Sequence, residues 1–328
     1  MKYFETVPVD SETVSFCVLL LIYIEAGKLQ LSARLTTFAS QFLTSMPKTL
    51  LFSLLLLLLP LAGRAQIVTT VPGSPTPEEV NSDSIRRAFD SGPYFGLYKD
   101  NYFIFGCPVG QRIRKDNCNI KFQISIAQRL TRSTLPWGTY LFLFYSQKCF
   151  WNVLENSMPM TDLNFNPGIG LTKPLFVRDR FVGKLNLVVE HESNGRDGTA
   201  SRSWNRITLG GSILIDPQIM VHGKAWIPII DGMENKDILD YCGIYQIGTS
   251  YTSLNQRFGV AVTLVKRKGW RLNYNTVVEL NYRIFPRDNQ YLFLQYYNGY
   301  GEGLLAYKEF HSMVRVGLVI KPRLFSDY

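Results

Sequence analysis

The sequence predicts an all-β fold, a transmembrane antiparallel β-barrel of about 12 strands that occupies residues 93–328. Three observations predict it. Segments of alternating apolar and polar residues recur from residue 93 to the C-terminus, and no stretch there is long and apolar enough to span a membrane as a helix. Aromatic residues are also abundant, with 21 Phe, 18 Tyr and 5 Trp, as in the aromatic girdles of membrane barrels. At roughly 20 residues for each strand and its share of loop, residues 93–328 give a barrel of about 12 strands.

The composition excludes a disordered chain. Hydrophobic residues make up 46% of the 328 residues and charged residues only 19%, whereas disordered chains combine low hydrophobicity with high charge. The five cysteines form no CxxC pair, so the sequence indicates neither a zinc site nor a disulfide scaffold.

Residues 46–65 have the pattern of a signal peptide. Lys48 supplies the positive charge, Leu50–Leu59 the apolar core, and Gly63 with Ala65 the small residues before cleavage at Gln66. We therefore expect export from the cytoplasm to the outer membrane. Residues 1–45 precede this pattern, and the simplest interpretation is a start codon placed too early, with Met46 as the initiator.

The exported chain is basic. Residues 66–328 carry 30 basic and 22 acidic residues, a net charge of +8. An exported protein rarely meets nucleic acid, so anionic lipid or lipopolysaccharide is the expected partner. Residues 66–92 are rich in Pro, Ser and Thr and are predicted to form a periplasmic arm.

Three segments show the alternation most clearly. Each has apolar residues at every second position, and these are Phe122, Ile124 and Ile126; Val278, Leu280, Tyr282 and Ile284; and Val314, Val316, Leu318 and Ile320. A soluble β-sandwich alternates as well. Aromatic residues near a predicted strand end favour the membrane barrel, because a girdle needs them there; they are Tyr291, Phe293, Tyr296, Tyr297 and Tyr300. Phe325 and Tyr328 near the C-terminus are also typical of such barrels.

Residues 184–211 predict a β-hairpin centred on Gly198, in the turn-rich run NGRDG. In that register His191 lies opposite Asn205 on the apolar face, and Glu190 lies opposite Arg206 on the polar face. Leu187 with Leu209 and Val189 with Ile207 also become cross-strand pairs. Val188 is the one apolar residue on the polar face.

The same register has a chemical consequence. His191 and Ser193 share a face at positions i and i+2, so the imidazole can accept the hydroxyl proton. Asn205, across the ladder, can orient the other ring nitrogen. This arrangement is that of a serine hydrolase with Asn in place of the usual carboxylate. Because these residues lie on the apolar face, the sequence predicts a lipid substrate.

The motifs HESNG (191–195) and SRSWNR (201–206) resemble the signature of the outer-membrane phospholipase A family. Further stretches resemble it too, namely KFQISIA (121–127), ENSMPMTDLNFNPG (155–168), DILDYCGIYQIG (237–248) and NGYGEGLLAY (298–307). The resemblance covers most of residues 93–328. It implies a 12-stranded barrel that hydrolyses either acyl ester of outer-leaflet phospholipids, requires calcium and is activated by homodimerisation.

The resemblance also implies roles for individual residues. Ser193 would be the nucleophile, His191 the general base and Asn205 the orienting residue, and the N–H of Gly195 would belong to the oxyanion hole. The calcium ligands would be the Arg196 carbonyl, the Ser201 hydroxyl and, from the partner subunit, a residue at the position of Ser157. Glu234 would be a calcium ligand of the monomer. Oxygen ligands of this kind suit a hard cation.

The sequence departs from the family at two positions. Gly198 stands where family members often carry an acidic residue, although Asp197 is adjacent. Glu234 stands where an Asp is expected, and its alternative interpretation is a solvated loop carboxylate.

Other candidate motifs have simpler interpretations. Gly299, Gly301 and Gly303 lack the context of a nucleotide-binding loop and are expected to allow close packing or a bend. His222 and His311 have no ligand set around them and are expected to be structural or exposed. A disulfide between Cys107 and Cys118 is one possible pairing of the four cysteines in the exported chain, and free thiols are another.

Two alternatives to a phospholipase stay open. A non-catalytic barrel, either a porin or a degenerate relative, would keep the fold, although the intact set of His191, Ser193, Ser201 and Asn205 disfavours it. An acyltransferase would use the same acyl-serine intermediate and pass the acyl chain to lipopolysaccharide or protein.

Overall fold

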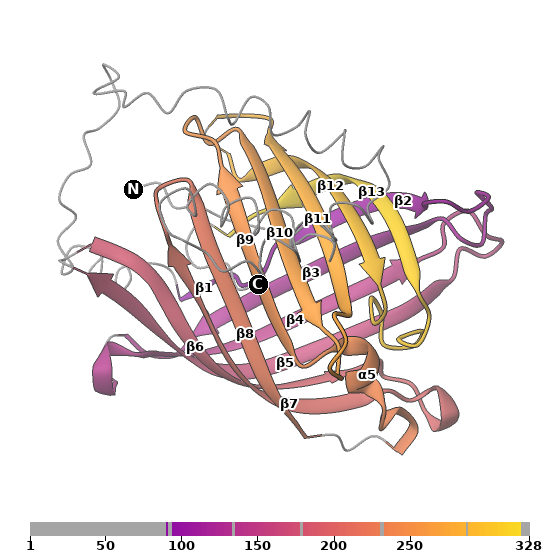
Figure 1. The fold of residues 1–328 in the computed structure, drawn as a ribbon, viewed down its shortest axis with the longest axis horizontal. Coiled ribbons are helices and arrows are strands. Elements are labelled where there is room, and N and C mark those ends of the chain that lie inside the picture. The colour runs from indigo at the N-terminus through magenta and orange to yellow at the C-terminus, as the bar shows by residue number, and fades with distance from the viewer. Residues whose placement is uncertain are drawn as a thin grey trace, which may run out of the picture. The chain divides into compact units, whose positions relative to one another are not determined.

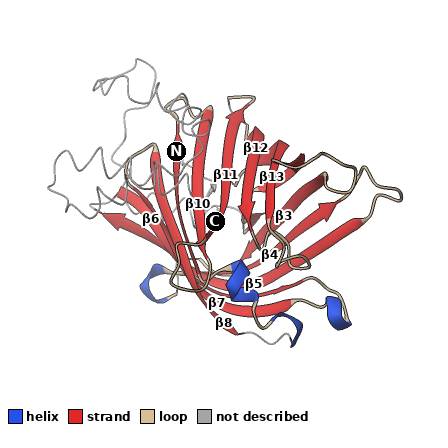
Figure 2. Ribbon diagram, turned by 45° about the vertical axis from the view of Figure 1, so that its right-hand side comes forward, coloured by secondary structure: helices blue, strands red, loops and turns tan. Residues whose placement is uncertain are grey.

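The computed structural model describes residue 90 and residues 94–132, 135–177, 180–229, 233–286 and 288–322. Within them the chain is almost entirely β-strand (Figure 2). The proposed signal peptide, the upstream extension, most of the periplasmic arm, and Phe325 and Tyr328 lie outside the described residues.

The strands follow one another along the chain with few helical interruptions. They are β1 (Phe95–Leu97), β2 (Asn101–Pro108), β3 (Asn119–Arg129), β4 (Tyr140–Trp151), β5 (Met160–Val177), β6 (Arg180–Ser193), β7 (Ser203–Leu214), β8 (Ile219–Ile229), β9 (Tyr245–Thr252), β10 (Phe258–Lys266), β11 (Tyr274–Arg283), β12 (Gln290–Gly299) and β13 (His311–Ile320). The helical elements are η1 (Pro136–Gly138), η2 (Gly198–Ala200), η3 (Met233–Asn235) and α5 (Ile238–Cys242).

The sheet closes on itself, and this confirms the predicted barrel. Every strand from β3 to β13 pairs antiparallel with the next, and β13 pairs with β2, which pairs with β3 (Figure 1). The ring therefore contains twelve strands, β2 to β13. The short strand β1 pairs with the far end of β3 and extends the line of β2. Closure matters because lipid supplies no hydrogen bonds to an open sheet edge.

The predicted alternation sorts side chains between the lumen and the outside. Residues facing the lumen are buried and mostly polar, among them Lys121, Ser125, Asn164, Asn186, Glu190, Glu279, Arg315 and Lys321. Residues at the alternate positions are apolar and exposed, among them Ile124, Leu185, Leu187, Val189, Leu209, Tyr282, Val316 and Leu318. The outer surface is thus suited to contact with lipid, and the lumen to hydrogen bonds and ion pairs. No helix in the described part of the chain is long and apolar enough to cross a membrane.

The prediction that the aromatic residues of β12 form an outward girdle is wrong for three of them. Tyr291, Phe293 and Tyr297 are buried and point into the barrel, where Tyr291 and Phe293 pack in one core cluster. Because successive residues of a strand face opposite sides, a run of neighbouring aromatics cannot all face lipid. Only the even positions of β12, such as Tyr296, face outward, and Tyr300 lies in the following loop.

The loop 300–310, between β12 and β13, folds into the barrel. Its Leu304 and Leu305 amides donate to Asn164 Oδ1 (3.0 Å) and Asp162 Oδ2 (2.9 Å) on β5. Leu304 and Tyr307 pack with Trp204 of β7 and Ile238 of α5. The loop therefore supports the inner wall of the barrel at the end of β6 and β7.

Glu302 anchors this loop in the lumen. Its carboxylate accepts two hydrogen bonds from Arg315, at 2.6 and 3.1 Å, and one from Lys121 Nζ at 3.0 Å. All three side chains are almost fully buried. Burial opposes ionisation of Glu302, but Arg315 and Lys121 outweigh it and hold the pKa of this carboxyl well below its ordinary value.

A second contact between loops lies at the same end of the barrel. Asp237, beside α5, accepts a hydrogen bond from the Tyr307 hydroxyl and pairs with Lys308 Nζ at 2.6 Å. Burial, together with this hydrogen bond, raises the pKa of Tyr307 to about 12. The phenol therefore stays protonated and remains the donor across the neutral range.

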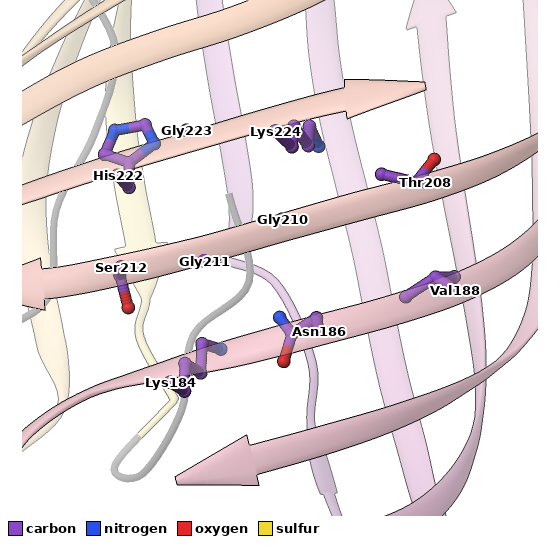
Figure 3. Close-up of a pocket in the computed structure, with 10 residues that line it drawn as sticks. All are labelled: Lys184, Asn186, Val188, Thr208, Gly210, Gly211, Ser212, His222, Gly223 and Lys224. Carbon is purple, nitrogen blue, oxygen red and sulfur yellow. The ribbon is translucent and has the colours of Figure 1, made fainter. Parts of the chain in front are cut away.

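The lumen also holds a polar hollow between β6, β7 and β8 (Figure 3). Gly210 faces inward between Asn186 and Lys224, and its missing side chain opens the space. The other lining residues are Lys184, Val188, Thr208, Gly211, Ser212, His222 and Gly223. A hollow with this lining suits water rather than lipid.

The structure shows the state of four cysteines and of His222. Cys107 and Cys118 form a disulfide, whereas Cys149 and Cys242 are free thiols. Burial raises the pKa of the Cys242 thiol to about 12, so it is not a thiolate at neutral pH. His222 is buried and bonds to Thr263 Oγ1 at 3.1 Å, as expected for a structural histidine.

Glu302→Gln is expected to destabilise the barrel by about 3 kcal/mol, because Arg315 and Lys121 would stay buried without a counter-charge. Urea unfolding of the purified protein in detergent would measure the change. The matched control is Glu309→Gln in the same loop. Its side chain is 73% exposed, so its removal should change stability by less than about 0.5 kcal/mol. Equal effects of the two substitutions would contradict the anchoring role.

The same pair predicts a pH dependence. A carboxyl whose folded-state pKa is lowered stabilises the fold above its unfolded pKa of about 4.3, and this stabilisation is lost as pH falls towards the folded value. The stability difference between the unsubstituted protein and Glu302→Gln should therefore be fully present near pH 5 and shrink below about pH 4. A difference that does not change in acid would show that the charge of Glu302 is not its source.

Candidate active site

The β6–β7 hairpin has the register predicted from the sequence. His191 pairs with Asn205, Glu190 with Arg206, Val189 with Ile207 and Leu187 with Leu209. The hairpin ends in the loop 194–202, which contains η2. The apolar pairs face outward and the charged pair faces the lumen, so both predicted faces are confirmed.

His191 and Asn205 are joined by a hydrogen bond between His191 Nδ1 and Asn205 Oδ1, 2.8 Å long. An amide oxygen can only accept, so Nδ1 donates its proton in this bond. The other ring nitrogen, Nε2, is left with a lone pair. The pair therefore provides an oriented imidazole that can act as a base.

Ser193 lies two residues beyond His191 on the same outward face. No hydrogen bond joins its hydroxyl to His191 among the described residues. Residues two apart on a strand are about 7 Å apart at their Cα atoms, so the contact depends on the side-chain rotamers. The surface next to this site is apolar and exposed, with Val189 at 52%, Ile207 at 36% and Leu209 at 60%.

Asn194 fixes the turn that follows Ser193. Its side chain is buried, donates to the Ala200 carbonyl at 2.8 Å and accepts from the Arg202 amide at 2.9 Å. Gly195 has φ of +63°, and a Cβ there would lie 2.9 Å from the Phe165 ring. The turn therefore requires glycine at 195, and the main chain there packs tightly against β5.

Behind the site, the lumen face of the hairpin carries an ion network. Arg206 binds both oxygens of Glu190, at 3.0 and 3.1 Å, and Glu192 at 3.0 Å. Trp204 Nε1 donates to Glu192 at 3.2 Å, and Thr208 Oγ1 to Glu190 at 2.6 Å. These bonds join β6 to β7 at the level of His191 and Asn205, so they hold the pair in register from the inside.

The β5–β6 ladder is interrupted opposite His191. Phe165 pairs with Ser193 and Gly168 with Glu190, but the two positions between them do not pair. The residue that would face His191 is Pro167, which has no N–H to donate. Instead, Asn166 Nδ2 donates to the His191 carbonyl at 2.9 Å. A side chain thus replaces the missing ladder bond at the backbone of His191.

The residues expected to bind calcium lie in separate loops. Arg196 and Ser201 lie in the loop 194–202, where the Arg196 carbonyl and the Ser201 hydroxyl bond to none of the described residues. Ser157, with φ of +64°, is exposed in the β4–β5 loop, and Glu234 is exposed in η3. Arg196 Nη2 donates to the Thr161 carbonyl at 2.7 Å, which ties the loop 194–202 to the start of β5.

The chemistry of these donors fits calcium. Two oxygens without bonds to other described residues, one carbonyl and one hydroxyl, belong to the same short turn, and calcium accepts such neutral oxygen ligands. Softer metals prefer His and Cys, and no group of three or more His, Cys, Asp or Glu residues that could hold a metal exists in the described ranges.

Sequence reasoning missed Asn166 and Asn194. Pro167 carried the signal for Asn166, because a proline inside a predicted strand leaves the facing carbonyl without a donor. Asn194 stands directly before a glycine in a turn, where asparagine side chains often bind the backbone.

Comparison with known proteins places this geometry in a family. Residues 107–320 match the family described as phospholipase A1. A phospholipase A1 of Escherichia coli K12 is 32% identical over 219 residues, which are 64% of this chain and 71% of that protein. A phospholipase A1 of Proteus vulgaris is 30% identical over 213 residues, 62% of this chain and 71% of that protein.

Comparison with solved structures supports the same family. The outer membrane phospholipase of Salmonella typhi, a dimer with bound calcium, superposes with a TM-score of 0.60 at 26% identity and covers 69% of this chain and 91% of its own. Outer membrane phospholipase A from Escherichia coli superposes with a TM-score of 0.60 at 25% identity, covering 69% of this chain and 93% of its own. The chain belongs to the phospholipase A1 family.

Proposed function

We propose that this protein is a calcium-dependent phospholipase of the outer membrane. It hydrolyses the sn-1 and sn-2 acyl esters of outer-leaflet glycerophospholipids and is activated by homodimerisation. Membership of the phospholipase A1 family supports phospholipase activity. The assignment to particular residues depends on one observation, the His191–Asn205 hydrogen bond on the same outward face as Ser193.

In the proposed reaction, Ser193 Oγ attacks the ester carbonyl and His191 Nε2 takes its proton. Collapse of the tetrahedral intermediate breaks the bond to the glycerol oxygen, which receives the proton from His191 and leaves as the lysophospholipid. Water, activated by the same imidazole, then releases the fatty acid from Ser193. Asn205 keeps Nδ1 protonated and Nε2 available throughout.

The negative charge of the intermediate needs a donor, and the N–H of Gly195 is our candidate. The positive φ of Gly195 and its packing against Phe165 fix the orientation of this part of the turn. A fixed donor costs little reorganisation when charge develops, which is the source of its catalytic effect.

The Arg196 carbonyl and the Ser201 hydroxyl would hold calcium, with Ser157 supplying a ligand to the partner subunit's site in the dimer and Glu234 serving the monomer. Bound there, the ion supplies positive charge near the developing oxyanion, where the apolar surroundings provide none. The related Salmonella typhi structure, a dimer with bound calcium, supports this part of the proposal.

The position of the site suits a substrate that arrives from the membrane. His191, Ser193 and Asn205 lie on the lipid-facing surface, at the end of the hairpin nearest the loop 194–202. Most connections at this end are longer than those at the other, as in the extracellular loops of outer-membrane barrels. The site therefore faces the outer leaflet. Residues 46–65 remain our candidate export signal.

Ser193→Ala is expected to abolish calcium-dependent fatty-acid release from mixed phospholipid–detergent micelles, with a loss of at least about a thousandfold. Chelation of calcium should do the same to the unsubstituted protein and be reversed by added calcium. Ser203→Ala, at the position that pairs with Ser193, is the matched control and should remain active. A correctly folded protein that releases no fatty acid under any condition would instead support a non-catalytic barrel.

Asn166→Ala is expected to lower kcat about fivefold with little change in KM, because the His191 carbonyl loses its donor and the imidazole loses its fixed position. Pro167→Ala restores a backbone N–H at the facing position. The double substitution Asn166→Ala with Pro167→Ala should therefore recover most of the lost kcat. A double variant as slow as Asn166→Ala alone would contradict this explanation and assign the loss to the other hydrogen bond of the Asn166 amide, which goes to Glu190 Oε2 at 3.0 Å.

A further inference from the structure

The loop 267–273, between β10 and β11, presents an apolar tip to solvent. Trp270 is fully exposed, at 105% of its reference area, and Leu272 is 68% exposed. The loop lies at the same end of the barrel as the loop 194–202. Such exposure is unusual for tryptophan, because its large ring gains much when it is buried against a partner.

The same loop is strongly basic. Arg267, Lys268 and Arg271 lie within five residues, and the loop contains no acidic residue. Lys268 pairs weakly with Asp240 at 3.5 Å, both side chains being about half exposed, and the Arg267 guanidinium lies 4.7 Å from the centre of the Tyr300 ring. The Arg271 side chain has no ion-pair partner among the described residues. The tip therefore combines apolar area with uncompensated positive charge.

Hydrogen bonds anchor the base of the loop. Lys266 Nζ donates to the Gly269 carbonyl at 2.8 Å, to Asn273 Oδ1 at 2.6 Å and to the Arg267 carbonyl. The Lys268 amide donates to the Leu239 carbonyl at 3.2 Å, which ties the loop to α5. The exposed tip is thus presented on a fixed base, which lowers the entropic cost of binding there.

The height of the loop places its tip at a membrane interface. Tyr245 and Tyr274 both pair with Lys266 and lie on the outward face at the ends of β9 and β11. Tyr245 is 38% exposed, and Ile247, the next outward residue of β9, is 44% exposed. Aromatic residues at this level mark the boundary between hydrocarbon and headgroups. Trp270 and Leu272 extend from just beyond it.

We propose that the loop 267–273 is a docking element for anionic lipid, which binds the phosphate groups of lipid headgroups in the leaflet around this end of the barrel. Trp270 and Leu272 enter the interfacial layer, and Lys268 and Arg271 contact phosphate oxygens, which guanidinium groups can bind in bidentate fashion. The charge of the loop favours an anionic lipid over a second copy of this chain, whose corresponding tip carries the same positive charge.

Tryptophan fluorescence tests the proposal. The protein would be purified in the Ser193→Ala background, so that lipid is not hydrolysed, and placed in zwitterionic detergent micelles. Phosphatidylglycerol or phosphatidylcholine is then titrated in. The difference between this protein and its Trp270→Phe variant isolates the emission of Trp270. We expect a blue shift with phosphatidylglycerol that is absent with phosphatidylcholine and suppressed by high salt.

Two further variants sharpen the test. Lys268→Gln with Arg271→Gln should raise the half-saturating mole fraction of phosphatidylglycerol roughly tenfold or more. Trp137→Phe is the matched control, because Trp137 is 83% exposed in η1, at the other end of the barrel. The difference between the spectra of the protein and of Trp137→Phe isolates the emission of Trp137, and this emission should not depend on the lipid headgroup.

Three results would overturn the proposal. They are a Trp270 emission that does not change with either lipid, an equal shift with both lipids, and a shift that follows protein concentration instead of lipid. The last would show a second copy of the chain as the occupant. Heat-modifiable migration of each variant confirms that the barrel is folded, so a loss of binding cannot be confused with unfolding.

Discussion

The structure depends on the closure of the sheet. In a membrane each backbone N–H and C=O group needs a partner within the protein, and a ring of twelve strands provides one for nearly every strand position. Closure also fixes which side chains face lipid and which face the lumen, because each strand alternates strictly between the two. His191, Ser193 and Asn205 occupy outward positions for this reason. If the pairing of β6 and β7 shifted by one residue, the site residues on one of the two strands would face the lumen.

The lumen is what makes such a slip costly. Arg206 lies between Glu190 and Glu192, and a change of register between β6 and β7 would leave these charges buried and unpaired. Glu302 lies between Arg315 and Lys121, and withdrawal of the loop 300–310 would leave those two cations buried and unpaired. Buried ion pairs contribute little net stability, but breaking one is expensive. The polar lumen therefore acts mainly to specify one arrangement of the outward surface. The exception to regular pairing, at Pro167, lies opposite His191, where the side chain of Asn166 restores the missing bond.

Sequence patterns could predict the fold and the hairpin because period-2 alternation is a local property. Glu190 opposite Arg206 and His191 opposite Asn205 satisfied both faces in one register, so the pairing could be inferred without coordinates. The orientation of β12 could not be inferred in the same way. Its run of aromatic residues fits either face, and only its pairing with β11 and β13 decides that Tyr291, Phe293 and Tyr297 enter the lumen. The contacts of Glu302 could not be predicted from local sequence patterns either, because they join residues up to 181 positions apart.

Covalent labelling of the nucleophile tests the central claim most directly, that one face of the β6–β7 hairpin forms a serine hydrolase site. The folded protein would be treated with an alkylsulfonyl fluoride in micelles containing calcium, digested, and its peptides identified by mass spectrometry. The account predicts a single adduct on Ser193 that is lost in His191→Ala, because only an oriented imidazole makes this hydroxyl nucleophilic. An adduct on another residue, or undiminished labelling of Ser193 without His191, would contradict it.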